Sequence, residues 1–189
     1  MPAASSALAL LTAVQAAGAV SITPAPLDAL EATLAQRDSA TLALEDWCAQ
    51  RQIADPPVIR ARALQMPRAA VPKRVRTTLG VSTKEPIQVR QVQLSCGDTV
   101  LSVAWNWYLP ARLTPAMNTA LRTSDTPFGK VVMPLGFRRE ALMQVAGRAE
   151  TCPVGTVSTH RARLMLPDSR PLAYVIECYT AATLTAGRP

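Results

Sequence analysis

The chain has 189 residues, 49% of them hydrophobic and 17% charged, which is typical of one globular domain with a substantial core. Its formal charge is +7, from 20 basic and 13 acidic side chains. A single histidine, His160, excludes the zinc motifs that need two, and four widely separated cysteines exclude CxxC redox and zinc-ribbon motifs. The nucleotide-binding glycine motifs and GxSxG are also missing.

The N-terminus is uncharged over residues 1–27 and nearly apolar over 7–20. That length fits the core of a signal peptide and is too short to cross a bilayer, so we expect no stable membrane insertion. No Lys or Arg precedes the apolar stretch, so an N-terminal helix packed on the domain is the alternative. We expect an N-terminal segment at 1–22, a domain over 23–185 and a tail at 186–189. The first alternative predicts a periplasmic or secreted protein, and the second a cytoplasmic one.

Residues 56–84 are rich in Arg and Lys and contain no acidic side chain. A basic stretch of this kind favours nucleic acid, an anionic surface or an anionic small molecule. No aromatic side chains are interspersed among the charges, as a base-stacking surface would require. We therefore expect a solvated, irregular segment and no nucleic-acid partner.

Helices are predicted from spacing and from N-cap signals. Leu27, Leu30 and Leu34 recur at helical spacing, and Asp38 to Thr41 is rich in N-cap residues. Thr114-Pro115 and Thr126-Pro127 each join a capping threonine to a proline suited to the first helical turn. The expected helices are 27–36, 41–50, and short ones after Thr114 and Thr126.

Strands are predicted where apolar residues alternate or cluster between turn residues. The expected strands are 58–64, 87–94, 100–109, 161–166 and 171–180. The second and third are joined by a hairpin at 95–98, and the last two by a hairpin at 167–170. Period-two alternation places Leu101, Val103, Trp105, Trp107 and Leu109 on one face. Helices combined with hairpin-linked strands indicate an α+β domain with an antiparallel sheet of about six strands and helices packed against it.

Two charged residues, Arg90 and Glu177, interrupt apolar strand patterns. A buried charge costs several kcal/mol unless it is paired or binds something. In one interpretation the two residues pair with each other or with other residues as a structural ion pair. In the other they line a polar pocket, where arginine suits a carboxylate and glutamate a hydroxyl.

The helix starts at residues 38–41 and 126–129 offer free backbone N–H groups, which favour anions. Gly129 leaves room for a ligand close to the backbone. Ordinary capping is the alternative for each start. His160 is a candidate acid by residue type, or else an ordinary polar residue at a strand start.

The order of these short motifs resembles the chorismate lyase family, which makes 4-hydroxybenzoate by eliminating pyruvate from chorismate. The matching pieces are Asp38-Ser39-Ala40-Thr41, Val89-Arg90-Gln91-Val92, Trp107-Tyr108-Leu109-Pro110, Thr126-Pro127-Phe128-Gly129-Lys130, Arg161-Ala162-Arg163-Leu164, Arg170-Pro171-Leu172 and Ile176-Glu177-Cys178-Tyr179. They cover about residues 26–182.

The resemblance implies a role for each matching residue. Arg90 would hold the ring carboxylate and Glu177 would contact the ring hydroxyl as the catalytic pair. Thr126, Phe128 and Gly129 would bind substrate at the second helix start, Phe128 through its backbone N–H. Ala40 would contribute its backbone, although the family position is bulkier, as in Met.

The resemblance thus predicts a monomeric carbon–oxygen lyase of ubiquinone biosynthesis without metal or cofactor. Its ligand would be a small anionic aromatic or cyclohexadienyl carboxylate, which the net positive charge would attract. The alternative is a non-catalytic module that binds an aromatic carboxylate, because the same fold serves as the effector-binding domain of GntR-type transcription regulators. The four cysteines would allow two disulfides in an oxidising compartment, or remain free.

Overall fold

The computed structural model describes residues 26–65, 70–149 and 151–187. The expected N-terminal segment 1–22, Arg68 and the last two residues of the expected tail lie outside the described residues. The boundaries of the domain therefore stay a prediction.

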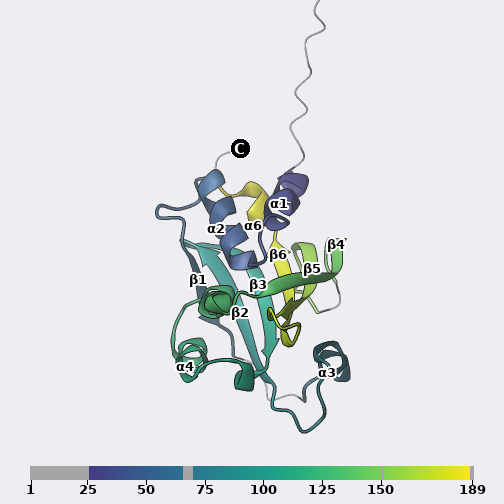
Figure 1. Cartoon of the computed structure of the whole chain (residues 1–189). Coiled ribbons are helices and arrows are strands. Elements are labelled where there is room, and N and C mark those ends of the chain that lie inside the picture. The colour runs from purple at the N-terminus through teal and green to yellow at the C-terminus, as the bar shows by residue number, and fades with distance from the viewer. Residues whose placement is uncertain (1–25, 66–69, 150, 188–189) are drawn as a thin grey trace, which may run out of the picture.

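Six strands form a single antiparallel sheet in the order β1-β2-β3-β6-β5-β4 (Figure 1). They are β1 Ile59–Ala63, β2 Gln88–Cys96, β3 Thr99–Tyr108, β4 Arg138–Ala146, β5 Thr156–Met165 and β6 Pro171–Thr180. The predicted α+β class, the antiparallel sheet and both hairpins are confirmed. Strand β4 was not predicted, because as an edge strand with largely exposed side chains it has no apolar alternation.

The predicted helices are also confirmed, since each expected start lies at an observed helix. The helices are α1 Pro26–Leu34, α2 Ala40–Gln50, α3 Lys73–Leu79, α4 Pro115–Thr123, α5 Phe128–Val132 and α6 Ala182–Thr185, with 3-10 turns at Pro110–Arg112 and Met133–Leu135. Within 56–84 the expected strand 58–64 is confirmed by β1. The expectation of a solvated, irregular segment is wrong at α3, where Val75 and Leu79 are fully buried.

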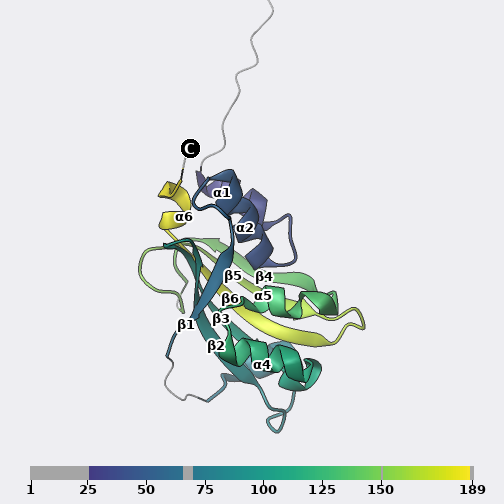
Figure 2. The same cartoon turned by 90° about the vertical axis from the view of Figure 1, so that its left-hand side faces the viewer.

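The sheet is covered differently on its two faces. On one face α1 packs on α2, α2 on α5, and α5 on α4, so these helices form a row along the sheet (Figure 2). On the other face α3 lies apart from this row and packs on β6 (Figure 1). A core cluster containing Trp105, Trp107 and Ile176 fills the space on the α3 side. The two larger apolar clusters lie on the side of the helical row.

The alternation expected for residues 101–109 is confirmed except at one residue. Val103, Trp105 and Trp107 face α3, whereas Leu101 belongs to the core beneath α1 and α2. The pairing of β2 with β3 shifts register between Leu94 and Ser95. A bulge of this kind inserts an extra residue and reverses the side on which the following side chains point.

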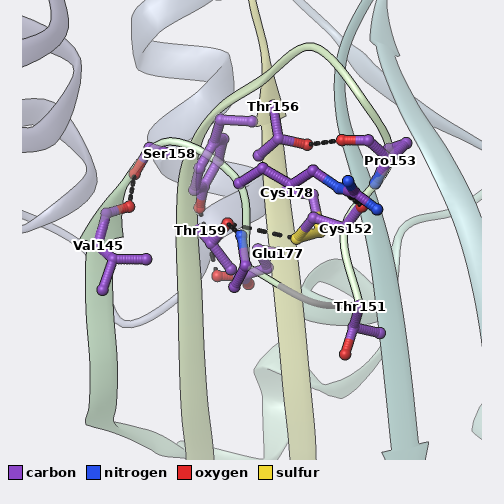
Figure 3. The surroundings of a disulfide bond; sticks show 12 residues. Val145, Thr151, Cys152, Pro153, Thr156, Ser158, Thr159, Glu177 and Cys178 are labelled. Carbon is purple, nitrogen blue, oxygen red and sulfur yellow. Dashed lines mark hydrogen bonds between the residues drawn. A yellow bond between two sulfur atoms is a disulfide. The ribbon is translucent and has the colours of Figure 1, made fainter.

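Two disulfides connect distant parts of the chain. Cys48–Cys96 joins α2 to the end of β2, and Cys152–Cys178 joins the loop before β5 to the central strand β6. Figure 3 shows the second bond, beside which Thr159 donates a hydrogen bond from its hydroxyl to Sγ of Cys152 at 3.4 Å. No helix within the described ranges has the length and apolar character that a bilayer span needs.

Candidate functional site

A small cavity lies between the sheet and the starts of α2 and α5, with a volume of about 30 Å³. Its apolar walls come mainly from the sheet. Its polar lining consists of Asp38, Ser39, Thr41, Asn106, Arg139 and Glu177. These side chains come from β3, β4, β6 and the start of α2, so they meet only in the folded protein.

Glu177 is buried on the central strand β6, as the sequence predicted, and its partner is Arg139 of β4. The guanidinium of Arg139 donates from Nη1 to Oε1 of Glu177 at 3.1 Å and from Nη2 to Oε2. The two side chains are 14% and 8% exposed. Burial by itself lowers the pKa of Arg139, but the Glu177 carboxylate outweighs it and raises that pKa above its ordinary value. Arg90 and Glu177 do not pair with each other, but Glu177 does form a buried ion pair with another residue, as the structural alternative also allowed.

Arg90 is buried as predicted, but its guanidinium is turned toward the connection between α4 and α5. Nη1 donates to the carbonyl of Thr126 at 2.9 Å and Nη2 to the carbonyl of Ser124 at 3.0 Å. Burial lowers the pKa of Arg90, and nearby Tyr108 and Asp125 partly oppose this. Neither Arg90 nor Thr126 lines the cavity. A substrate-binding role for these two residues stays a prediction, and the observed contacts make Arg90 a support for the turn before α5.

The two predicted helix starts meet at the cavity. Ser39 caps α2, its hydroxyl accepting from the backbone N–H of Leu42 at 3.4 Å. Ala40, Phe128 and Gly129 line the cavity. A Cβ added at Gly129 would overlap the Ser39 hydroxyl. Ser39 thus occupies the space beside the Gly129 Cα, and the glycine allows α5 to pack against α2. A ligand contact at the Gly129 backbone stays a prediction.

Two residues of the cavity, Asn106 and Arg139, were not among the predicted site residues. Asn106 is 6% exposed and its side chain lines the cavity, yet its amide makes no hydrogen bond to any described residue. It interrupts the apolar run of β3, as Glu177 interrupts β6, so its position in the sequence was a usable signal. Arg139 had no such signal, because it lies in a strand whose exposed pattern resembles a loop.

A larger cleft of about 380 Å³ adjoins the cavity, between α1, the α1–α2 connection and strands β4 and β5. Arg139 and Asp38 line both spaces, and Asp38 accepts a hydrogen bond from the backbone N–H of Arg139 at 2.7 Å. His160 lines the cleft and not the cavity, beside Glu31. Among the described residues no group of His, Cys, Asp and Glu is arranged to hold a metal ion.

The fold defined by this sheet and helical row is that of the effector domain of PhnF from Mycobacterium smegmatis. The chain matches that domain with a TM-score of 0.54 and 13% identity, over 76% of this chain and 89% of that one. It matches PhnF itself with a TM-score of 0.56 and 10% identity, over 78% and 66% of the two chains. A GntR-family transcriptional regulator from Enterococcus faecalis V583 gives a TM-score of 0.48 at 11% identity, over 65% and 94%. The two PhnF matches show that the chain has the fold of an effector domain, and they show the fold alone.

A curated protein shares more of its sequence with this chain than these structures do. The chain is 36% identical over 184 residues to the uncharacterized protein y4mC of Sinorhizobium fredii (strain NBRC 101917 / NGR234), covering 87% of this chain and 78% of that protein. Since the match spans most of both chains, the protein belongs to the family of y4mC. No family model matches it.

Proposed function

We propose that the protein is a small-molecule binding domain whose ligand is a small carboxylate held in the cavity beneath α2. The main support is Asn106, whose amide faces the cavity without a hydrogen-bond partner among the described residues. An amide carries both a donor and an acceptor, so a ligand in the cavity could bind this side chain through either group.

The other polar groups of the cavity define the chemistry of the ligand. Arg139 has a planar pair of donors suited to a carboxylate, and Glu177 is an acceptor suited to a hydroxyl. The two side chains now bind each other, so a ligand would bind them by replacing part of this contact. The Thr41 hydroxyl and the first turn of α2 add donors at the opposite wall. A small aromatic or cyclohexadienyl acid with a hydroxyl group satisfies all of them.

One feature of the site favours binding over the lyase reaction. The arginine expected to hold the substrate carboxylate, Arg90, is engaged by two backbone carbonyls. The cavity of about 30 Å³ corresponds to about two water molecules, so either function requires it to widen to admit a ring. The fold shared with the PhnF effector domain agrees with a binding role. Chorismate lyase activity stays a prediction.

The experiment compares the full chain with the variant Asn106→Leu, which keeps the side-chain volume and removes the polar atoms. Thermal unfolding is measured with and without 4-hydroxybenzoate. Ligand at 100 times its Kd stabilises the wild type by about 2.7 kcal/mol. The variant is expected to be about as stable as the wild type without ligand, because the Asn106 amide makes no hydrogen bond to another described residue, and to lose the ligand-induced shift.

A parallel assay with chorismate tests the lyase prediction. Release of pyruvate and 4-hydroxybenzoate that disappears in Arg90→Ala would make the protein a lyase and contradict a purely binding role. A ligand-induced shift retained in Asn106→Leu would contradict the role of the cavity. Asn118→Leu is the matched control, because this asparagine lies on α4 and does not line the cavity.

A further inference from the structure

The cavity and the cleft share a wall, and this arrangement determines how large a ligand the protein can hold. The cavity measures about 30 Å³ and the cleft about 380 Å³. Arg139 and Asp38 line both. Since Arg139 lies in the shared wall, the two spaces would join there only if its side chain moved away from Glu177. A ligand whose head occupies the cavity would then extend directly into the cleft.

The cleft contains a buried acceptor and a buried donor side by side. Glu31 of α1 accepts from Nε2 of Gln144 at 2.7 Å and from the Ser158 hydroxyl at 2.5 Å. Nε2 of His160 lies 2.8 Å from Oε2 of Glu31, but without the alignment of a hydrogen bond, and it has no other partner among the described residues. The His160 side chain is 10% exposed, so solvent alone satisfies it poorly.

The protonation state of Glu31 is set by these neighbours. Burial raises the pKa of Glu31, but the neighbouring His160 imidazole and the hydrogen bond from Ser158 outweigh burial and lower that pKa below its ordinary value. Glu31 is therefore an ionised acceptor near neutral pH. The imidazole ring stands edge-on to Tyr179, with 5.0 Å between the ring centroids, which fixes its orientation.

A hydroxyl is the chemical group that matches an adjacent donor and acceptor, because it accepts one hydrogen bond and donates another. We propose that the cleft is a second subsite, in which Glu31 and His160 bind a hydroxyl of a ligand whose acidic head lies in the cavity. The ligand class is thus a small acid extended by a hydroxylated group. The apolar side chains of Leu34 and Met143 line the same cleft and would contact the carbon skeleton of that extension. This inference depends on the proposed function.

The test compares two probes, 4-hydroxybenzoate and the 3-O-β-D-glucoside of 3,4-dihydroxybenzoate, by isothermal titration calorimetry on the full chain. Both keep the carboxylate and the 4-hydroxyl for the widened cavity, and the second adds hydroxyls that reach the cleft. The wild type is expected to bind the glucoside at least ten times more tightly. The variants Glu31→Gln and His160→Phe are expected to reduce this affinity ratio to about one, and Gln144→Ala, at an exposed site, to reduce it in part.

The outcomes separate the two proposals. If 4-hydroxybenzoate binds and the glucoside binds no more tightly, the second subsite is refuted and the cavity stands. If the ratio stays near ten in Glu31→Gln and in Gln144→Ala, the assignment of the hydroxyl to this pair is wrong. If neither probe binds the wild type, both the binding of a hydroxylated aromatic acid in the cavity and its extension into the cleft are refuted.

Discussion

Removing the charge of Glu177 tests the buried Arg139–Glu177 ion pair most directly. The variant Glu177→Gln keeps the shape of the side chain and an acceptor for the Tyr179 hydroxyl, which donates to Oε2 of Glu177 at 3.3 Å. It leaves the Arg139 guanidinium, 14% exposed, without a counter-charge. Breaking a buried pair in this way costs about 3–5 kcal/mol. A double variant that also carries Arg139→Met removes both charges and is expected to regain most of that stability.

The assay is urea and thermal unfolding of the wild type, the two single variants and the double variant, all without ligand. At about 2–4 °C per kcal/mol for a domain of this size, Glu177→Gln lowers the Tm by roughly 6–20 °C. The double-mutant cycle gives the coupling free energy of the pair directly, and we expect at least ~2 kcal/mol. A coupling below about 0.5 kcal/mol, typical of exposed pairs, would refute the reasoning that the pair is desolvated.

Three further predictions concern the framework of the site. Replacing Cys48 and Cys96 by alanine opens a link across 48 residues and lowers the free energy of unfolding by about 4 kcal/mol in the chain-entropy estimate, measured by urea unfolding. Gly129→Ala lowers it by about 1–3 kcal/mol, because the added Cβ overlaps the Ser39 hydroxyl. The folded-state pKa of Glu31 lies below its ordinary value of 4.5, so this carboxylate stabilises the fold above that pH and the contribution is lost as the pH falls through the lower folded value. The free energy of unfolding of Glu31→Gln, measured against pH, is therefore expected to fall less at acidic pH than that of the wild type.

Each of these predictions has a contrary outcome. If the variant with alanine at Cys48 and Cys96 unfolds at the wild-type urea midpoint, this disulfide does not constrain the unfolded chain. Gly147→Ala is a control for Gly129→Ala, since a Cβ there meets no atom although its φ of +82° adds backbone strain. If the two alanine variants lose equal stability, steric overlap with Ser39 is not the cause. If stability falls at acidic pH in Glu31→Gln as it does in the wild type, a group other than Glu31 takes up the proton.

The agreement between sequence and structure is closest where a strand is buried on both faces. The run at β6 is apolar on both sides, so Glu177 was recognisable as a buried charge on a central strand. Strand β4 could not be recognised, because its side chains are largely exposed and leave no period-two pattern. Helix α3 was missed because the basic side chains of Lys73, Arg74 and Arg76 obscure the short apolar pair Val75 and Leu79.

The sequence could not show which residue pairs with each buried charge. Alternation reveals that a residue points into the core, but it gives no information on which residue of another strand it meets. Arg139 and Glu177 are 38 residues apart and come together through the pairing of β4 with β5 and of β5 with β6. Arg90 instead reaches the carbonyls of Ser124 and Thr126, which the sequence shows as an ordinary turn.

The sequence by itself determined the class of fold, most of the helices and strands, and the burial of Arg90 and Glu177, because these depend on short-range periodicity and turn chemistry. Only the tertiary structure decided the Arg139–Glu177 pair, the unpartnered Asn106, the cavity beneath α2 and the adjoining cleft. These features depend on strand order and register, which bring together residues from β3, β4 and β6 that no local pattern connects.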